Sequence, residues 1–344
     1  MDARLSRRSI LSGAATGALC AGFGLAPSPR ALAADFYQGK TLTMIVGFAP
    51  GGGVDSTARV VAKHLVRFIP GQPNVVVQNM EGAAGMVAAS HLERRVAADG
   101  LTIATPGRSW FIEGVTKNPS VSFDPTKFTY IGSPGVPNSM MYVRSASGIK
   151  SFDELKASPK TLSFGALGGG TMTAMVPTML AANGVPVKAI VGYGSTARIL
   201  LALEQGEVDG IFTVEDTFAR RQDLLKNRIV IPILQNKATA TGIPLVRDAF
   251  PGNQRGLLDL VLSSENFGLP VVGPPGIPAD RVDILRKAFL AMCADKEYQA
   301  EATRIDQPVG APLDGAQLAA MMNALAAAAT PEMVAAYRRL TVSK

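Results

Sequence analysis

The stretch that most constrains the fold is an apolar run that ends in three consecutive glycines. Residues 42–46 form the run, residues 51–53 are the glycines, and apolar residues then recur at helical spacing over 54–68. This order predicts a buried strand, a glycine loop and a helix that begins near Asp55 and Ser56. Such a loop points backbone N–H groups and the positive end of the helix dipole at one place, which suits an anion.

A second stretch repeats this design in the middle of the chain. A strand is expected over 161–164, followed by the glycine run 168–170 and a helix over 171–182. Either loop alone can be explained as a tight turn between a strand and a helix. If the two loops face each other across a cleft, two helix N-termini converge on one site. Neutral N–H and hydroxyl donors there can hold a carboxylate without an arginine.

Strands and helices alternate along most of the chain with short glycine turns between them, which indicates an α/β fold with parallel strands. The chain has 344 residues, 47% of them hydrophobic, and this suggests two lobes rather than one. We expect the first lobe over 34–140 and 267–344 and the second over 141–266. No strand is expected after Val272, and the C-terminal helices are expected to pack on the first lobe.

The N-terminus reads as a targeting segment. A twin arginine, Arg7 and Arg8, precedes an apolar stretch over 10–25, and Ala31-Leu32-Ala33 supplies a small-x-small cleavage signal. We interpret residues 1–33 as a secretory signal of the twin-arginine type, because the apolar stretch is glycine-rich and short for a membrane anchor. The mature protein is therefore expected in the periplasm.

Charge and cysteine content exclude some classes of protein. The signal segment carries four arginines against one aspartate, so the net charge of +7 falls to +4 when it is removed. No dense basic stretch or aromatic-rich platform suited to a nucleic acid remains. Cys293 is then the single cysteine, so neither an intramolecular disulfide nor a cysteine metal site is expected.

An exported α/β oxidoreductase is the main alternative, with a dinucleotide bound at the first glycine loop. The loop reads G-x-G-x-x-S, because Ser56 stands where the dinucleotide fingerprint has its third glycine. The acidic residue expected after the second strand is also missing, apart from Glu81. A Walker-type phosphate loop is rejected because Val54 and Asp55 follow the last glycine in place of lysine and a hydroxyl residue.

A hydrolase finds little support in the sequence. No G-x-S-x-G nucleophile elbow occurs at a strand-to-helix turn. The two histidines, His64 and His91, both fall inside predicted helices beside basic residues, and we interpret them as solvated helix residues rather than general bases. Asp55 is interpreted as a helix cap that shapes the loop rather than as a catalytic acid. A third class, an exported scaffold, would form a stable protein complex and leave the cleft empty.

The order and spacing of several motifs resemble the tripartite tricarboxylate transporter receptors, the Bug family of periplasmic binding proteins. The resemblance extends from about Gly39 to the C-terminus. It rests on residues 48–59, 79–85, 98–102, 192–195, 203–209 and 274–278. Each motif is weak alone, but their succession is specific. The resemblance implies a two-lobe Venus-flytrap fold, type II, that binds a small organic carboxylate and passes it to a membrane permease.

The resemblance also implies where the ligand lies. In this family one carboxylate is typically held by backbone groups and ordered waters from the two glycine loops, and a tyrosine segment borders the far end of the pocket. Transferred by position, the expected ligand-binding residues are Ala49, Pro50, Gly51, Gly52, Gly53, Asp55, Ser56, Gly168, Gly169, Gly170, Thr171, Tyr193 and Asp216. We expect no catalytic residue, metal or cofactor, and a monomer whose lobes close about hinges near 140–144 and 267–272.

Overall fold

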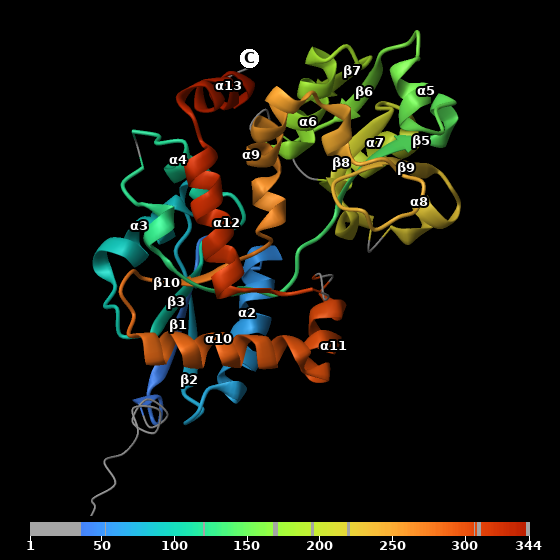
Figure 1. Cartoon of the computed structure of the whole chain (residues 1–344). Helices are drawn as coiled ribbons and strands as arrows, with labels where there is room; N and C mark the ends of the chain where they lie inside the picture. Colours follow the sequence, from blue (N-terminus) through green and yellow to red (C-terminus); the bar gives the residue numbers. More distant parts are fainter. Residues whose placement is uncertain are drawn as a thin grey trace, which may run out of the picture.

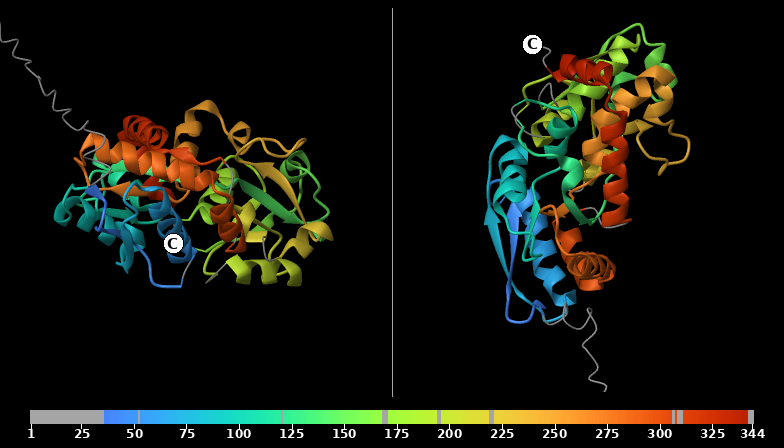
Figure 2. Two further views of the ribbon diagram at one scale, coloured as in Figure 1. Left: turned by 90° about the horizontal axis from the view of Figure 1, so that it is seen from below. Right: turned by 60° about the vertical axis from the view of Figure 1, so that its left-hand side comes forward.

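The structure is a computed structural model that describes residues 36–51, 53–119, 121–167, 171–193, 196–218, 221–305, 307 and 311–341. The expected signal segment, Gly52 and the glycine run 168–170 lie outside the described residues. Two α/β lobes lie side by side, and Figures 1 and 2 show them from three directions.

In the described chain, six strands form the sheet of the first lobe in the order β11-β4-β10-β3-β1-β2. β1 pairs in parallel with β2 and β3, whereas β10 and β11 run antiparallel to their neighbours. The strands are β1 (Thr41–Val46), β2 (Asn74–Asn79), β3 (Thr102–Thr105), β4 (Thr129–Ser133), β10 (Val271–Gly273) and β11 (Leu313–Asp314). The helices are α2 (Gly53–Leu65), α3 (Met86–Arg95), α4 (Trp110–Val115), α10 (Ala279–Ala294), α11 (Lys296–Arg304) and α12 (Gly315–Ala328).

The second lobe has a five-stranded sheet in the order β7-β6-β8-β5-β9, again within the described residues. Its strands are β5 (Ser139–Arg144), β6 (Leu162–Gly165), β7 (Val187–Ile190), β8 (Gly210–Val214) and β9 (Val230–Gln235). Its helices are α5 (Phe152–Lys156), α6 (Met172–Ala182), α7 (Thr196–Gln205), α8 (Gln222–Lys226) and α9 (Arg255–Asn266), and α13 (Pro331–Thr341) is the last helix that the structure describes. Short 3-10 helices lie at 66–68, 83–85, 125–127, 145–147, 215–218, 246–249 and 252–254.

Alternating burial explains how each sheet is covered on both faces. In β1, Leu42, Met44 and Val46 pack with α2 and α10, while Ile45 packs on the opposite face with α3 and α12. A strand buried on both faces carries apolar residues at successive positions, and β1 shows this at 44–46 and at Leu42, with Thr43 between them. β5 shows the same division between its alternate residues.

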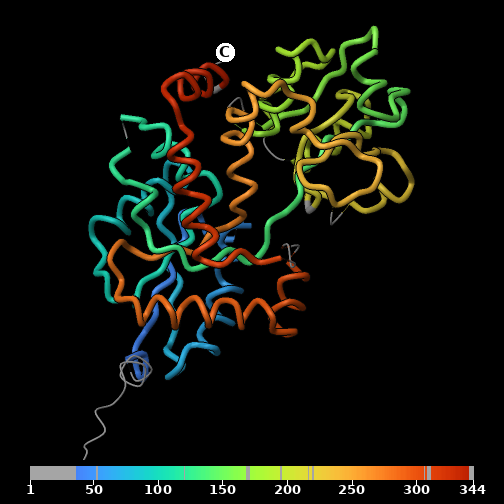
Figure 3. Tube along the Cα trace, in the orientation of Figure 1, coloured from blue at the N-terminus to red at the C-terminus, as the bar shows by residue number. Residues whose placement is uncertain are grey.

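One apolar core joins the two lobes. It includes the α3, α4 and α12 face of the first sheet together with α5, α6 and α9 beside the second. α9 lies between the lobes and contacts α4, α6 and α13 (Figure 1). Just beyond α9, the rings of Phe111 and Phe267 meet with centroids 4.6 Å apart. Figure 3 traces the two chain connections between the lobes, one before β5 and one between α9 and β10.

The C-terminal region departs from expectation in two ways. The prediction that no strand follows Val272 is wrong, because β11 pairs antiparallel with β4. A two-residue strand carries no periodic signal. It ends at Asp314, which forms the capping box with Gln317 that starts α12. α10 and α12 pack on β4 as expected, but α13 contacts α9 and α6 instead.

Within the described residues, no single helix is both long and apolar enough to cross a membrane. The bent pair α12 and α13, which turns through 96°, satisfies that criterion by length and composition only.

Three backbone segments meet closely at the carboxyl end of the first sheet. A Cβ atom on Gly47 or on Gly85 would collide with the carbonyl group of Pro106. Gly85 also has a φ of +95°, a conformation that other residues adopt only at a cost. The loops after β1, β2 and β3 can therefore converge only because two of them carry glycine at the contact.

An alanine methyl group at position 85 would collide with the Pro106 carbonyl group. Gly85→Ala should therefore lower the free energy of unfolding by more than backbone strain alone explains. Gly148→Ala is the matched control, because Gly148 has a φ of +81° and no atom lies within 4 Å of the place that its added methyl group would take. We expect the control to cost about 1 kcal/mol and Gly85→Ala to cost about 1–3 kcal/mol more. Urea unfolding of both variants measures the difference. Equal losses would contradict the close contact.

Candidate ligand-binding site

The loop after β1 is organised by Asp55. The Asp55 carboxylate accepts hydrogen bonds from the Gly51 N–H at 2.9 Å, from Arg59 Nε at 2.9 Å and from Asn79 Nδ2 at 2.8 Å. Asn79, at the end of β2, also donates to the carbonyl oxygen of Phe48 at 2.8 Å. Asp55 is 2% exposed. These contacts fasten the glycine loop to the neighbouring strand.

The prediction that Asp55 caps the helix is wrong, although Asp55 does shape the loop before it. α2 begins at Gly53, so Asp55 lies within its first turn and reaches back to the loop that precedes the helix. Burial alone would raise the pKa of Asp55, but the hydrogen bonds from Arg59, Gly51 and Asn79 outweigh it and lower the pKa to about 2. The carboxylate uses the Gly51 N–H that the sequence suggested for a ligand.

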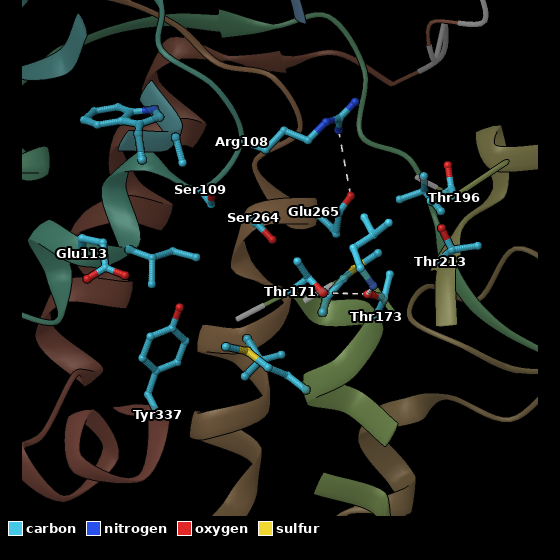
Figure 4. A pocket seen from close by; sticks show the side chains of 18 of the residues that line it. Arg108, Ser109, Glu113, Thr171, Thr173, Thr196, Thr213, Ser264, Glu265 and Tyr337 are labelled. Carbon is cyan, nitrogen blue, oxygen red and sulfur yellow. Dashed lines mark hydrogen bonds and ion pairs between the residues drawn. The ribbon is translucent and has the colours of Figure 1, made fainter. Parts of the chain in front are cut away.

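A cavity of about 510 Å³ lies between the lobes (Figure 4). The loops beyond β2 and β3 and the start of α4 supply one wall. The α6 and α7 N-terminal residues and the end of β8 supply another, and α9 and α13 complete it. Its lining residues are Ala83, Ala84, Met86, Arg108, Ser109, Trp110, Ile112, Glu113, Leu167, Thr171, Met172, Thr173, Met175, Thr196, Thr213, Val214, Thr217, Val261, Ser264, Glu265 and Tyr337.

An arginine and a glutamate face each other in this cavity. Arg108 follows β3 and Glu265 lies near the end of α9, and Arg108 Nη1 is 3.9 Å from Glu265 Oε2. Both atoms are buried and neither has a hydrogen-bond partner in the described chain. Burial raises the pKa of Glu265 above its usual range, and the charges of Arg108 and Lys237 offset only part of the rise.

Hydroxyl groups dominate the rest of the polar lining. Thr171 Oγ1 and Thr173 Oγ1 are 2.6 Å apart, and Thr173 Oγ1 also accepts from the Leu167 N–H at 3.1 Å. The hydroxyls of Thr213 and Thr217 are 2.8 Å apart. Thr171 is the N-cap residue of α6, so the positive end of that helix dipole faces the cavity. Among the described lining residues, Arg108 is the one cation, and it stands with several neutral donors that a small polar ligand could use.

Backbone strain marks another part of the cavity wall. Ala83 and Ala84 adopt φ values of 45° and 52°, a left-handed conformation that costs roughly 1–2 kcal/mol per residue. Such strain persists where surrounding contacts enforce it. Here the contact of Gly85 with Pro106 holds the loop that presents the two alanines to the cavity.

The residues predicted from sequence are distributed unevenly around this cavity. Thr171 lines it, whereas Tyr193 does not and packs against the α7 face of the second lobe. Six others, in and after the first glycine loop, do not line it: Ala49, Pro50, Gly51, Gly53, Asp55 and Ser56. Gly52, Gly168, Gly169 and Gly170 lie outside the described residues, and for Asp216 the structure describes only its place in the 3-10 helix 215–218.

Sequence reasoning missed Arg108, Glu265 and Tyr337. A signal for Arg108 exists, because ligands in open α/β sheets bind beyond the carboxyl ends of strands and Arg108 lies three residues after the end of β3. Glu265 gives no comparable signal, since it is one polar residue on a helix with buried apolar neighbours. Tyr337 reaches the cavity only because α13 packs across α9 and α6.

The expectation of a solvated His64 is wrong. His64 is 3% exposed and lies between α2 and α11, where its Nε2 is 2.8 Å from Glu301 Oε2. Arg67 Nη1 lies 2.9 Å from Nδ1, so Nδ1 accepts and Nε2 donates to Glu301. The ring also meets Tyr298 edge-on. Among the described residues, no group of three or more His, Cys, Asp or Glu is placed to hold a metal ion.

The Asp55 contacts predict a distinctive pH dependence of stability. Because the folded pKa is near 2 against an ordinary 3.8, Asp55 stabilises the fold above about pH 4 and loses that effect as the pH falls toward 2. Asp55→Asn should lower the free energy of unfolding by about 2 kcal/mol at pH 7. Asp153→Asn, at an 88% exposed carboxylate, should change little. Denaturant unfolding from pH 7 to 2 tests this, and a difference from wild type that persists undiminished at pH 2 would contradict it.

Known proteins similar to this chain include both sequence relatives and solved structures. A protein from Cupriavidus necator described as "UPF0065 protein in gbd 5'region" is 25% identical over 310 residues, which cover 88% of this chain and 89% of the relative. A ligand-free TctC solute-binding protein from Polaromonas has a TM-score of 0.64 at 17% identity, covering 88% of this chain and 98% of that one. MatC from Rhodopseudomonas palustris with bound malate has a TM-score of 0.55 at 19% identity, covering 88% and 99%.

These similarities confirm the predicted two-lobe α/β fold of periplasmic binding proteins. The family model described as "Tripartite tricarboxylate transporter family receptor" matches residues 57–250. The chain therefore belongs to the tripartite tricarboxylate transporter receptor family, as its sequence motifs predict.

Proposed function

We propose that this protein is an exported solute receptor that binds a small carboxylate anion between its lobes and delivers it to the permease of a tripartite transporter. The observation that carries the proposal is the guanidinium of Arg108 in a hydroxyl-lined cavity between the two lobes. Membership of a receptor family and the malate bound to MatC support the same ligand class. The proposal involves binding without a chemical step.

Arg108 would anchor the ligand carboxylate. A guanidinium presents planar donors that match a carboxylate, and charge-assisted hydrogen bonds of this kind are roughly twice as strong as neutral ones. The α6 N-terminus at Thr171 and the α7 N-terminus at Thr196 add the positive ends of two helix dipoles on the other side of the cavity. A ligand held by both groups would touch both lobes at once.

Contact with both lobes would couple binding to closure. We propose lobes over 34–140 with 267–344 and over 141–266, which rotate about the two connections traced in Figure 3. On closure, the glycine loops around 49–56 and 168–171 and the segments at Tyr193 and Asp216 would approach the ligand. Closure would also give the permease a surface that distinguishes loaded from empty receptor.

The protein would act in the periplasm after removal of residues 1–33, as a monomer that meets its permease transiently. The twin-arginine pattern and the family support this location. The proposal needs no cofactor, because the cavity offers charge and hydrogen bonds to the ligand directly. An exported dinucleotide-binding oxidoreductase would instead carry nicotinamide or flavin absorbance after purification.

Substitution of Arg108 tests the proposed anchor. Carboxylates should raise the melting temperature of the wild-type protein, with a stabilisation of about 2.7 kcal/mol at 100 times Kd. Arg108→Gln should weaken carboxylate binding at least tenfold, since a hydrogen bond to a charged group contributes about 1.5–3 kcal/mol. Arg247→Gln is the matched control, because Arg247 pairs with Asp259 outside the cavity. Thermal shift and titration calorimetry with mono-, di- and tricarboxylates give the measurements.

Two results would count against the proposal. One is the absence of any thermal shift with carboxylates while a neutral compound stabilises the protein. The other is equal loss of carboxylate affinity in Arg108→Gln and Arg247→Gln, which would separate binding from the cavity.

A further inference from the structure

We propose that the Arg108–Glu265 pair makes this cavity select a carboxylate whose neighbouring carbon carries a hydrogen-bond donor, a hydroxyl or an amino group. The inference rests on the proposed function, because it assumes that the ligand carboxylate meets Arg108. It adds a role for Glu265, as the acceptor that distinguishes substituted acids from plain ones.

Arg108 and Glu265 face each other but are too far apart to form a direct hydrogen bond. Arg108 Nη1 and Glu265 Oε2 are 3.9 Å apart, beyond the 2.7–2.9 Å typical of a direct hydrogen bond between such charged groups. Each of the two atoms is buried, and within the described chain each lacks a hydrogen-bond partner. The glutamate side chain is 10% exposed and borders the cavity, as Figure 4 shows. Buried polar groups are rarely left in this state, so a missing partner is implied.

A substituted acid would satisfy both groups together. Its carboxylate oxygens would accept from Arg108, and the donor on the next carbon would point to Glu265. The carboxylate and the donor of such a ligand lie on adjacent carbons. This spacing suits Arg108 Nη1 and Glu265 Oε2, which are 3.9 Å apart. Hydroxyls at Thr171 and Ser264 border the same end of the cavity and can complete the contacts of the ligand.

Charge balance disfavours an unsubstituted acid. A bare carboxylate would place a second negative group beside Glu265 without a hydrogen-bond donor between them, in a cavity that also contains Glu113. The positive charge of Lys237 also acts on Glu265, while its ammonium donates hydrogen bonds to the carbonyl oxygens of Val136 and Pro137, at 3.3 and 3.1 Å. A hydroxyl or ammonium on the ligand changes the contact with Glu265 from repulsive to attractive. Sites built around a buried acceptor reject analogues that leave it unpaired.

Matched acids on one carbon skeleton test the inference. Succinate, malate and aspartate differ only in a hydrogen, a hydroxyl or an ammonium at one carbon, and the glutarate and propionate series repeat the comparison at other lengths. Calorimetry on the full chain should show the substituted acids of at least one series binding tenfold or more tighter than the plain acid. Glu265→Gln, which keeps the side-chain shape but removes the charge, should reduce that ratio to threefold or less for the amino acid and strengthen binding of the plain acid.

Asp259→Asn on the same helix is the control and should leave the ratios unchanged, because Asp259 is 48% exposed and pairs with Arg247. If plain and substituted acids bind equally tightly, Glu265 has no selective role while the carboxylate receptor stands. A ratio that survives Glu265→Gln and Glu265→Leu would also overturn the inference. If no acid binds in any series, the proposed function fails and this inference with it.

Discussion

The close approach of three backbone segments at the carboxyl end of the first sheet is the contact on which the binding region depends. Gly47 and Gly85 allow the loops after β1 and β2 to touch the Pro106 carbonyl after β3, where a side chain would separate them. The contact holds the strained residues Ala83 and Ala84 in place. It also positions Pro106, and with it Arg108 two residues later. Because the backbone segments at this junction are in close contact, none can shift without moving the others. The junction therefore sets the position of the residues that follow it in the cavity wall.

Two buried carboxyl groups, of Asp55 and Glu265, behave in opposite ways. Asp55 receives donors from Gly51, Arg59 and Asn79, and these hold its pKa near 2. Glu265 is buried to a similar degree, but its Oε2 lacks a donor in the described chain and its pKa is raised. Hydrogen bonds to the charged form and desolvation act in opposite directions on a carboxyl group. The satisfied acid maintains the loop, and the unsatisfied acid is the one that faces a cavity, where perturbed groups often mark function.

The cavity is built from segments that come together only in the folded chain. α9 passes between the lobes and presents Glu265, while α13 crosses α9 and α6 and presents Tyr337. One continuous apolar core includes buried residues of α3, α4, α6 and α9 and surrounds this region. A ligand in the cavity would therefore contact groups from both lobes and from the C-terminal helix. Such a ligand would make more contacts with a closed form of the protein than with an open form. Binding shifts the populations of two forms only when the ligand has different affinities for them.

Elements with strong local signals can be predicted along the chain. The apolar run before Gly51 specified β1, helical periodicity specified α2, and the succession of motifs identified the family. These features are local or rest on fixed spacing, so they are readable along the chain. Three features emerge from the folded chain instead: β11 pairs with β4, His64 is buried, and Arg108 meets Glu265. Those outcomes arise from packing between residues far apart in sequence, for which neither periodicity nor spacing carries a signal.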